Sequence, residues 1–275
     1  MSKLEKIEKT VAISEIRKGA SPSSVWVFDC DGTLVEGDVG TVAAYTILKA
    51  GLASAQETPS CWKPEVMASL DFHGFENLRY KLADEVGFQQ VFDWETLVLT
   101  GLPKDMAESY VLRGLNEAFQ KSYLTEIHPT CDLARDFKQN AWIVSGSPKV
   151  SVAQMAKRLG IDEKRVIATE LEDVDGILTS TMKPPGIVWA DLKAKLLKSR
   201  GIVPYMVCGD STGDWEMMEM ATHRVWAVVW LGRPYIGTTL DKAIEDRFQV
   251  KIPRDAGLYT FTSDKQTWYL DVRNF

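Results

Sequence analysis

The sequence contains few of the residues that build a disulfide framework or a zinc site. Only four of its 275 residues are cysteines and only three are histidines. None of the cysteines belongs to a CxxC pair, and they lie far apart in the chain, at Cys30, Cys61, Cys131 and Cys208. This spacing argues against both a disulfide framework and a zinc site. We therefore expect free thiols in a reducing compartment, the cytosol.

The sequence also lacks a long hydrophobic run and an excess of positive charge. No apolar stretch approaches the roughly 20 residues that span a bilayer, and the segment Met1–Lys6 is too polar for a signal peptide. Acidic residues outnumber basic residues by 38 to 32, which gives a net charge of −6. Because non-specific nucleic-acid binding needs a basic face, we expect no nucleic acid among the partners. Without an apolar run or a signal peptide, we also expect no membrane partner and a cytoplasmic location.

The most informative stretch is an apolar run that ends in two carboxylates. Val25–Phe28 shows no polar alternation, which is typical of a strand buried on both faces of a parallel sheet. Asp29 and Asp31 follow at the end where such sheets bind ligands, and Gly32 then turns the chain. Two acids this close repel each other unless a cation offsets their charge, so the pair predicts a divalent-metal site. The alternative is a strand followed by an ordinary Asp-Gly turn.

The order of the predicted elements indicates an α/β fold with a helical insertion. An amphipathic helix is expected over residues 3–18. From Val35 to about residue 126 no segment resembles a buried strand, and helical segments recur between glycines and prolines. Strands and helices alternate after residue 127. We predict a doubly wound parallel sheet as the core, residues 1–38 and 127–275, with a smaller all-helical cap domain, residues 39–126.

Three predicted strands end in polar signatures, at residues 29–33, 145–147 and 209–214. The carboxyl ends of parallel strands meet at one edge of a sheet, so these side chains are expected to converge. Together with a serine, four carboxylates would form an oxygen-rich site of the kind that Mg²⁺ accepts: Asp29, Asp31, Asp210 and Asp214. Ser147 is expected to cap the next helix, with Pro148 in its first position.

These motifs closely resemble those of the haloacid dehalogenase (HAD) superfamily of aspartate-nucleophile hydrolases. The DxDGT and GDSxxD pair, with a helical cap directly after the first motif, matches its phosphoserine-phosphatase-like branch over roughly residues 24–232. The resemblance implies a Mg²⁺-dependent phosphatase in which Asp29 is the nucleophile and Asp31 the general acid and base. It further implies that the phosphate is contacted by Ser145, Gly32, Thr33 and Gly146. The implied metal contacts come from Asp29, the Asp31 backbone carbonyl, Asp210 and Asp214.

The family also needs a lysine that neutralises the phosphoryl group, and the sequence offers two. Lys193 lies in the first turn of a helix that Asp191 is expected to cap, beside the predicted site. Its spacing to Asp210 is shorter than the family usually shows. Lys183, in a proline-containing loop, is the alternative. We predict Lys193.

Substrate selection is expected to come from the cap. Asp38 matches the acid with which phosphoserine phosphatases bind the substrate amine, and Arg79 matches the arginine that pairs with a substrate carboxylate. These matches make phosphoserine, or a related amine-bearing phosphate, the candidate substrate. As alternatives, Asp38 is a linker acid and Arg79 a surface arginine. Trp62 and Trp94 offer an aromatic box for a choline-like cation, although core packing is the simpler use of both.

The sequence leaves three activities and two assembly states open. The first activity is hydrolysis of a small phosphorylated metabolite through an aspartyl-phosphate. The second is transfer of the same phosphoryl group to an alcohol. The third is a non-catalytic binding protein on the same fold, which the intact acids disfavour because a degenerate site would be free to lose one. Either a monomer or a homodimer is compatible with the sequence.

Overall fold

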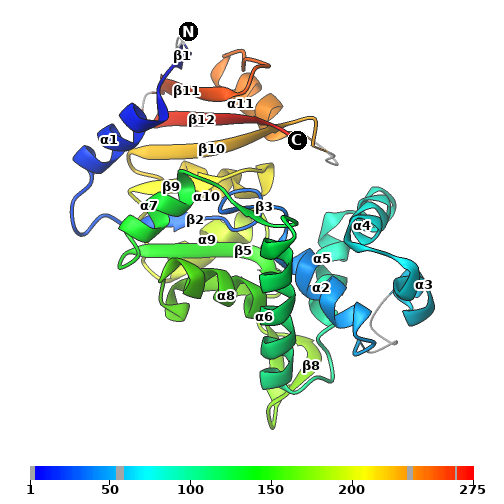
Figure 1. Ribbon diagram of the computed structural model, residues 1–275. Coiled ribbons are helices and arrows are strands. Elements are labelled where there is room, and N and C mark those ends of the chain that lie inside the picture. The colour runs from blue at the N-terminus through cyan, green and yellow to red at the C-terminus, as the bar shows by residue number, and fades with distance from the viewer. Residues whose placement is uncertain (1–3, 54–58, 234–237, 264) are drawn as a thin grey trace.

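The computed structural model describes residues 4–53, 59–233, 238–263 and 265–275, and its centre is an eight-stranded sheet. The strands from β12 to β6 run parallel, and β11 and β1 add an antiparallel edge (Figure 1). In spatial order the strands are β1 (Glu5–Lys6), β11 (Gly257–Thr262), β12 (Thr267–Asn274), β10 (Arg224–Leu231), β9 (Met206–Gly209), β2 (Trp26–Phe28), β5 (Ala141–Pro148) and β6 (Val166–Thr169).

Helices cover both faces of this sheet because alternate strand residues point to opposite sides. In β2, Trp26 and Phe28 pack on one face and Val27 on the other. The first face is covered by α1 (Lys9–Gly19), α7 (Thr130–Asp136) and α8 (Lys149–Leu159). The second face is covered by α9 (Asp191–Ser199), α10 (Trp215–Glu219) and α11 (Leu240–Phe248). The predicted doubly wound α/β fold is confirmed.

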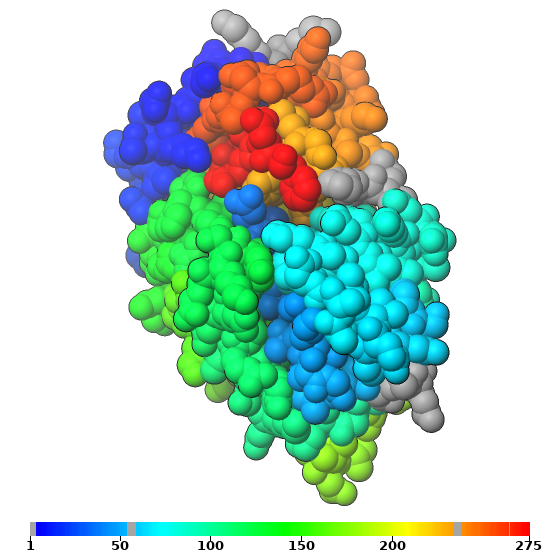
Figure 2. Space-filling model, turned by 45° about the vertical axis from the view of Figure 1, so that its right-hand side comes forward, coloured from blue at the N-terminus to red at the C-terminus, as the bar shows by residue number. Residues whose placement is uncertain are grey.

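A helical insert, which we define as α2 to α6, lies between two short strands that pair antiparallel, β3 (Val35–Glu36) and β4 (Thr125–Glu126). Its described residues contain no strand. α6 packs against α8, and the buried side chains of the insert join the hydrophobic cluster on that face of the sheet. Figure 2 shows the insert, in blue to cyan-green, beside the red C-terminal segment. The insert helices are α2 (Val39–Lys49), α3 (Pro64–Ser69), α4 (Phe72–Val86), α5 (Phe88–Leu97) and α6 (Lys104–Gln120).

A β-hairpin contacts the insert from the core side. β7 (Leu171–Val174) and β8 (Ile177–Met182) form this hairpin. The chain between α5 and α6 bonds to it through three backbone hydrogen bonds: Gly101 N to Leu178 O, Leu178 N to Leu102 O, and Lys104 N to Gly176 O. Three 3₁₀ turns complete the described elements, η1 (Ser60–Trp62), η2 (Glu163–Arg165) and η3 (Thr212–Asp214).

Three local predictions were wrong. Glu5 and Lys6 form β1, which pairs with β11, so the first helix begins only at Lys9. β5 continues through Pro148, which pairs with Thr169 of β6, so Ser147 caps no helix and α8 begins one residue later than predicted. α9 begins at Asp191 itself, with no side-chain cap. None of the described helices is both long enough and apolar enough to cross a membrane.

Candidate active site

Three neighbouring strands deliver the predicted side chains to one edge of the sheet. β2 lies between β9 and β5, with Phe28 opposite Cys208 on one side and Ile143 on the other. Asp29 leaves β2 at this point, and its backbone N–H donates to the Cys208 carbonyl at 2.9 Å. Asp210 follows β9, and Ser145 belongs to β5. The central position of β2 therefore places Asp29 between the other two motifs.

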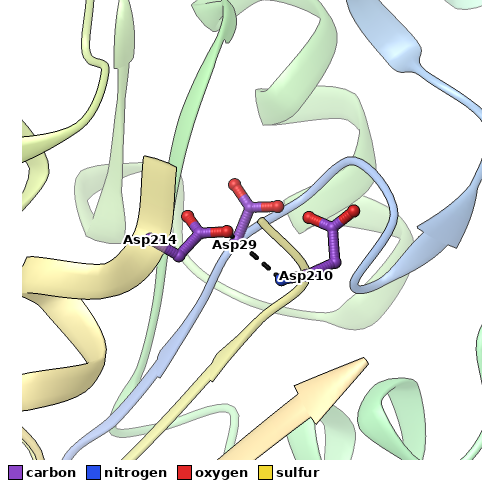
Figure 3. A group of neighbouring side chains, drawn as sticks. All are labelled: Asp29, Asp210 and Asp214. Carbon is purple, nitrogen blue, oxygen red and sulfur yellow. Dashed lines mark hydrogen bonds between the residues drawn. The ribbon is translucent and has the colours of Figure 1, made fainter. Parts of the chain in front are cut away.

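Asp29, Asp210 and Asp214 form a compact cluster of buried carboxylates (Figure 3). One carboxylate oxygen from each lies within 4.8 Å of the others. Asp214 is fixed by three bonds to its Oδ2, from the Asp210 N–H at 3.2 Å and from the N–H and hydroxyl of Ser211, both at 3.1 Å. It makes no side-chain cap to α10, and with Ser211 it forms the capping box of the 3₁₀ turn Thr212–Asp214.

Lys193, in the first turn of α9, places its ammonium group inside this cluster. Its Nζ lies 2.6 Å from Asp29 Oδ1 and 2.7 Å from Asp214 Oδ1, and its side chain is only 2% exposed. Lys183 instead pairs with Glu170 at 2.6 Å, in the hairpin region. The structure thus brings Lys193, and not Lys183, to the acids.

Burial and mutual repulsion shape the protonation of these groups. Burial, and then the Asp214 charge, raise the pKa of Asp29 to about 8, against the attraction of Lys193. Burial likewise raises the pKa of Asp210 to about 8. Burial alone would lower the pKa of Lys193, but the charges of Asp214 and Asp29 outweigh it and raise the pKa. Lys193 is therefore a permanent cation that offsets part of the acidic charge.

Asp31 lies in the loop after β2 and accepts bonds from three directions. Its Oδ2 accepts from the hydroxyls of Ser145 at 3.1 Å and Ser147 at 2.7 Å, and its Oδ1 accepts from the Val39 N–H at 2.7 Å. Burial, and then the charge of Asp38, raise its pKa to about 7, although these bonds favour the charged form. A carboxyl group with this pKa can both donate and accept a proton near neutral pH.

Gly32, Thr33 and Gly146 mainly hold the backbone around the site in place. Gly32 adopts φ +77°, and a Cβ there would overlap the Asp210 carboxylate, so only glycine fits. Its N–H donates to the Val35 carbonyl at 2.7 Å. The Thr33 hydroxyl donates to Asp210 Oδ1 at 3.5 Å, and the Gly146 carbonyl accepts from Thr169 at 2.7 Å.

Asp38 and Arg79 meet at the boundary between the insert and the core, with a third residue that the sequence analysis missed. Arg79 Nη2 donates to Asp38 Oδ2, and Arg79 Nε donates to Glu95 Oε1, both at 2.7 Å. All three side chains are buried, and burial raises the pKa of Glu95 to about 7, against the attraction of Arg79. Thr41 bonds to both acids. Two carboxylates thus face one guanidinium.

A cavity connects the acids to the insert, and aromatic side chains form much of its wall. The sequence analysis singled out none of the five aromatic residues in this wall, which are Tyr80, Phe88, Phe92, Trp189 and Trp230. Trp62 and Trp94 do not line it. Trp62 packs against both Trp94 and Phe75 in the insert, and both tryptophans join the hydrophobic cluster, so the core-packing alternative is the correct one for both.

Arg233 is a further residue that the sequence analysis missed, and it forms an ion pair with Asp210 at the cavity wall. It follows β10, at the edge where the other strand-end motifs lie, but no motif surrounds it. A basic residue just beyond the end of a buried strand was the only sequence signal available.

The family model of haloacid dehalogenase-like hydrolases matches residues 26–219, so this chain belongs to that family. The resemblance to the HAD superfamily that the motifs predict is therefore confirmed. No curated protein matches the chain significantly.

Solved structures share the fold at low sequence identity. A protein of unknown function from Bordetella pertussis Tohama I is 18% identical, with a TM-score of 0.59 over 83% of this chain and 97% of that one. A functionally unknown protein from Anaerococcus prevotii DSM 20548 is 13% identical, with a TM-score of 0.60 over 89% and 90%. A HAD family hydrolase from Salmonella enterica serovar Typhi is 16% identical, with a TM-score of 0.51 over 89% and 75%.

Proposed function

We propose that this chain is a cytoplasmic Mg²⁺-dependent phosphatase of the phosphoserine-phosphatase-like branch, which hydrolyses a small phosphomonoester through an aspartyl-phosphate on Asp29. The observation that carries this proposal is the hydrogen bonding and burial of the Asp29 carboxylate. One of its oxygens accepts a bond from Lys193 at 2.6 Å inside a buried acidic cluster, so its second oxygen remains for attack on phosphorus. In this proposal residues 1–38 and 127–275 form the catalytic core, and residues 39–126 form the cap.

The donor set fits a hard divalent cation. Asp29, Asp210 and Asp214 offer carboxylate oxygens within 4.8 Å of one another, and the cluster contains neither sulfur nor imidazole. These three residues, with the Asp31 backbone carbonyl, would hold Mg²⁺. The bound ion supplies charge neutralisation between an anionic nucleophile and an anionic ester.

The side chains divide the reaction into two steps. Asp29 attacks phosphorus, and Asp31 gives its proton to the departing alkoxide, which leaves as the alcohol. Asp31, now ionised, takes a proton from the water that attacks the aspartyl-phosphate, which releases inorganic phosphate and restores both carboxyl groups. In this proposal Lys193 and Ser145 stabilise negative charge on the phosphoryl oxygens.

Phosphate release from a panel of small phosphomonoesters, with Mg²⁺ and with EDTA, tests the proposed activity. The panel includes phosphoserine, phosphoethanolamine, phosphocholine, sugar phosphates and nucleotides. We expect turnover with Mg²⁺ and none with EDTA or in Asp210→Asn. An added alcohol that captures the phosphoryl group in place of water would identify a phosphotransferase instead. A folded protein that turns over no ester would favour the binding-protein alternative.

Asp38 and Glu95 favour an amine on the substrate, because two carboxylates face the single Arg79 guanidinium. We expect Asp38→Asn to raise KM for phosphoserine and phosphoethanolamine by about tenfold, as loss of a charge-assisted hydrogen bond does. KM for a sugar phosphate, which carries no amine, should change little. Equal changes for both kinds of ester would contradict a role of Asp38 in amine binding.

Ser147 sets the proton affinity of Asp31, which gives a prediction for pH dependence. Its bond to Asp31 stabilises the charged form, so Ser147→Ala should raise the pKa of Asp31 by about one unit. Because the first step needs protonated Asp31, the fall of kcat/KM at high pH should move to higher pH. Ser151→Ala is the matched control, since the Ser151 hydroxyl donates to the Pro148 carbonyl and not to Asp31. An unchanged pH profile in Ser147→Ala would contradict this assignment.

A further inference from the structure

Arg233 lies outside the segment that the family model matches, yet its guanidinium pairs with one of the three clustered carboxylates. The ion pair joins Arg233 Nη1 to Asp210 Oδ2, and the Asp210 side chain is only 4% exposed. Because a guanidinium is not deprotonated in proteins, Arg233 is a fixed positive charge at the edge of the acidic cluster.

The surroundings of Arg233 are built to hold it there. The indole N–H of Trp230 donates to the Gly32 carbonyl at 2.9 Å and ties the end of β10 to the loop that carries Asp31. The ring of Phe275 lies 6.0 Å from the guanidinium, and the Phe275 N–H donates to the Leu231 carbonyl at 3.0 Å. A Cβ at Gly32 would clash with both Asp210 and Arg233, so the ion pair packs directly on the glycine backbone.

An arginine in this position conflicts with a divalent cation at the same carboxylate. A guanidinium on Asp210 and a doubly charged ion on the same group would repel each other across a buried space, where screening by solvent is weak. We propose that Arg233 and the divalent cation compete for Asp210, and that the guanidinium released by the cation binds the phosphate of the substrate. This inference rests on the proposed function, because it takes Asp210 as a metal ligand.

The released guanidinium would have a suitable partner close by. Arg233 and Asp29 line the same cavity. The Nη1 atom of Arg233 already lies against Gly32, in the loop that follows Asp29. A guanidinium pairs with phosphate oxygens through two parallel hydrogen bonds, a geometry that a lysine does not reproduce. The cation would then both occupy Asp210 and make an anion-binding group available.

Calorimetric titration of Mg²⁺ into the metal-free protein tests the competition directly. We expect Arg233→Met to bind Mg²⁺ about tenfold more tightly than the wild type, since a competing cation is removed. Arg233→Lys, which keeps the charge, should stay close to the wild type. Unchanged or weaker Mg²⁺ binding by Arg233→Met would overturn the inference.

A second titration measures the other half of the proposal. With Mg²⁺ saturating, inorganic phosphate should bind about tenfold more weakly to Arg233→Met than to the wild type, and Arg233→Lys should recover only part of the loss. Equal phosphate affinity in Arg233→Met and the wild type would overturn phosphate binding by Arg233.

A neighbouring arginine provides the matched control. Arg273 packs over the Trp230 ring at 5.7 Å and pairs with Asp271, not with Asp210. Arg273→Met should leave both affinities unchanged, and a change as large as that in Arg233→Met would overturn a specific role of Arg233. A wild-type protein that binds no Mg²⁺ would instead overturn the proposed function, so the two failures are distinguishable.

Discussion

Replacing Asp29 by asparagine is expected to lower phosphate release by more than about 10³-fold, the largest effect on activity at this site. A carboxamide cannot form the aspartyl-phosphate, whereas the side chain keeps its size and Lys193 keeps its bond to Asp214. Turnover of the best ester of the panel, with saturating Mg²⁺, measures the loss. Circular dichroism should show that the variant remains folded.

Asp175→Asn is the matched control for this variant. Asp175 lies in the exposed turn between β7 and β8, away from the cavity, and asparagine tolerates its left-handed φ of +52°. Its activity should equal that of the wild type. If Asp29→Asn retains a tenth of the activity or more, Asp29 is not the nucleophile.

Replacing Lys193 by methionine is expected to cause the largest loss of stability, about 3–5 kcal/mol in the free energy of unfolding. The variant leaves Asp29 and Asp214 buried together without a cation, and both side chains are nearly inaccessible. The pKa of Asp29, about 8 in the folded wild type, should rise further in the variant because Lys193 no longer favours the charged form, so the folded variant keeps the Asp29 proton to higher pH. The loss of stability should therefore be smaller at pH 6 than at pH 9, which urea unfolding at both values measures.

Two further variants make the Lys193 result specific. Lys183→Met removes a partly exposed lysine that pairs with Glu170, and it should cost less than about 1 kcal/mol. The double variant Lys193→Met/Asp214→Asn removes one of the two unpaired acids and should recover part of the stability. Equal losses at Lys183 and Lys193, or a loss that grows toward acid pH, would contradict the buried ion-pair assignment.

The elements that the sequence predicted correctly are those with a local signal. The apolar run before Asp29 and the glycine after Asp31 specify a buried strand and its turn within eleven residues. The error at the N-terminus has a non-local cause, because Glu5 and Lys6 become a strand only by pairing with β11, some 250 residues later in the chain. Ser147 was misassigned for a similar reason, since a bulged pairing with β6 prolongs β5 through Pro148.

In the candidate site, too, residues with a local sequence signal were predicted and residues that depend on distant partners were not. Motif residues such as Asp29, Asp31 and Asp210 were identified because each follows a strand. Glu95 and Arg233 escaped notice because their partners come from other parts of the chain, Arg79 in a different helix and Asp210 after a different strand. The choice between Lys193 and Lys183 had a local basis, the first turn of α9, and the geometry agrees with it.

The contact between the insert and the β7–β8 hairpin limits how the cavity can open. Helices α2 to α5 are anchored at one end by β3 and at the other by the three backbone bonds that Gly101, Leu102 and Lys104 make with the hairpin. Helices α2 and α5 also pack against β5 of the core, and α2 packs against α8. A rigid swing of these helices would therefore have to break the hairpin bonds and separate these packed faces. The part of the cavity wall that α5 carries, with Phe92, is thus fixed to the core at several places.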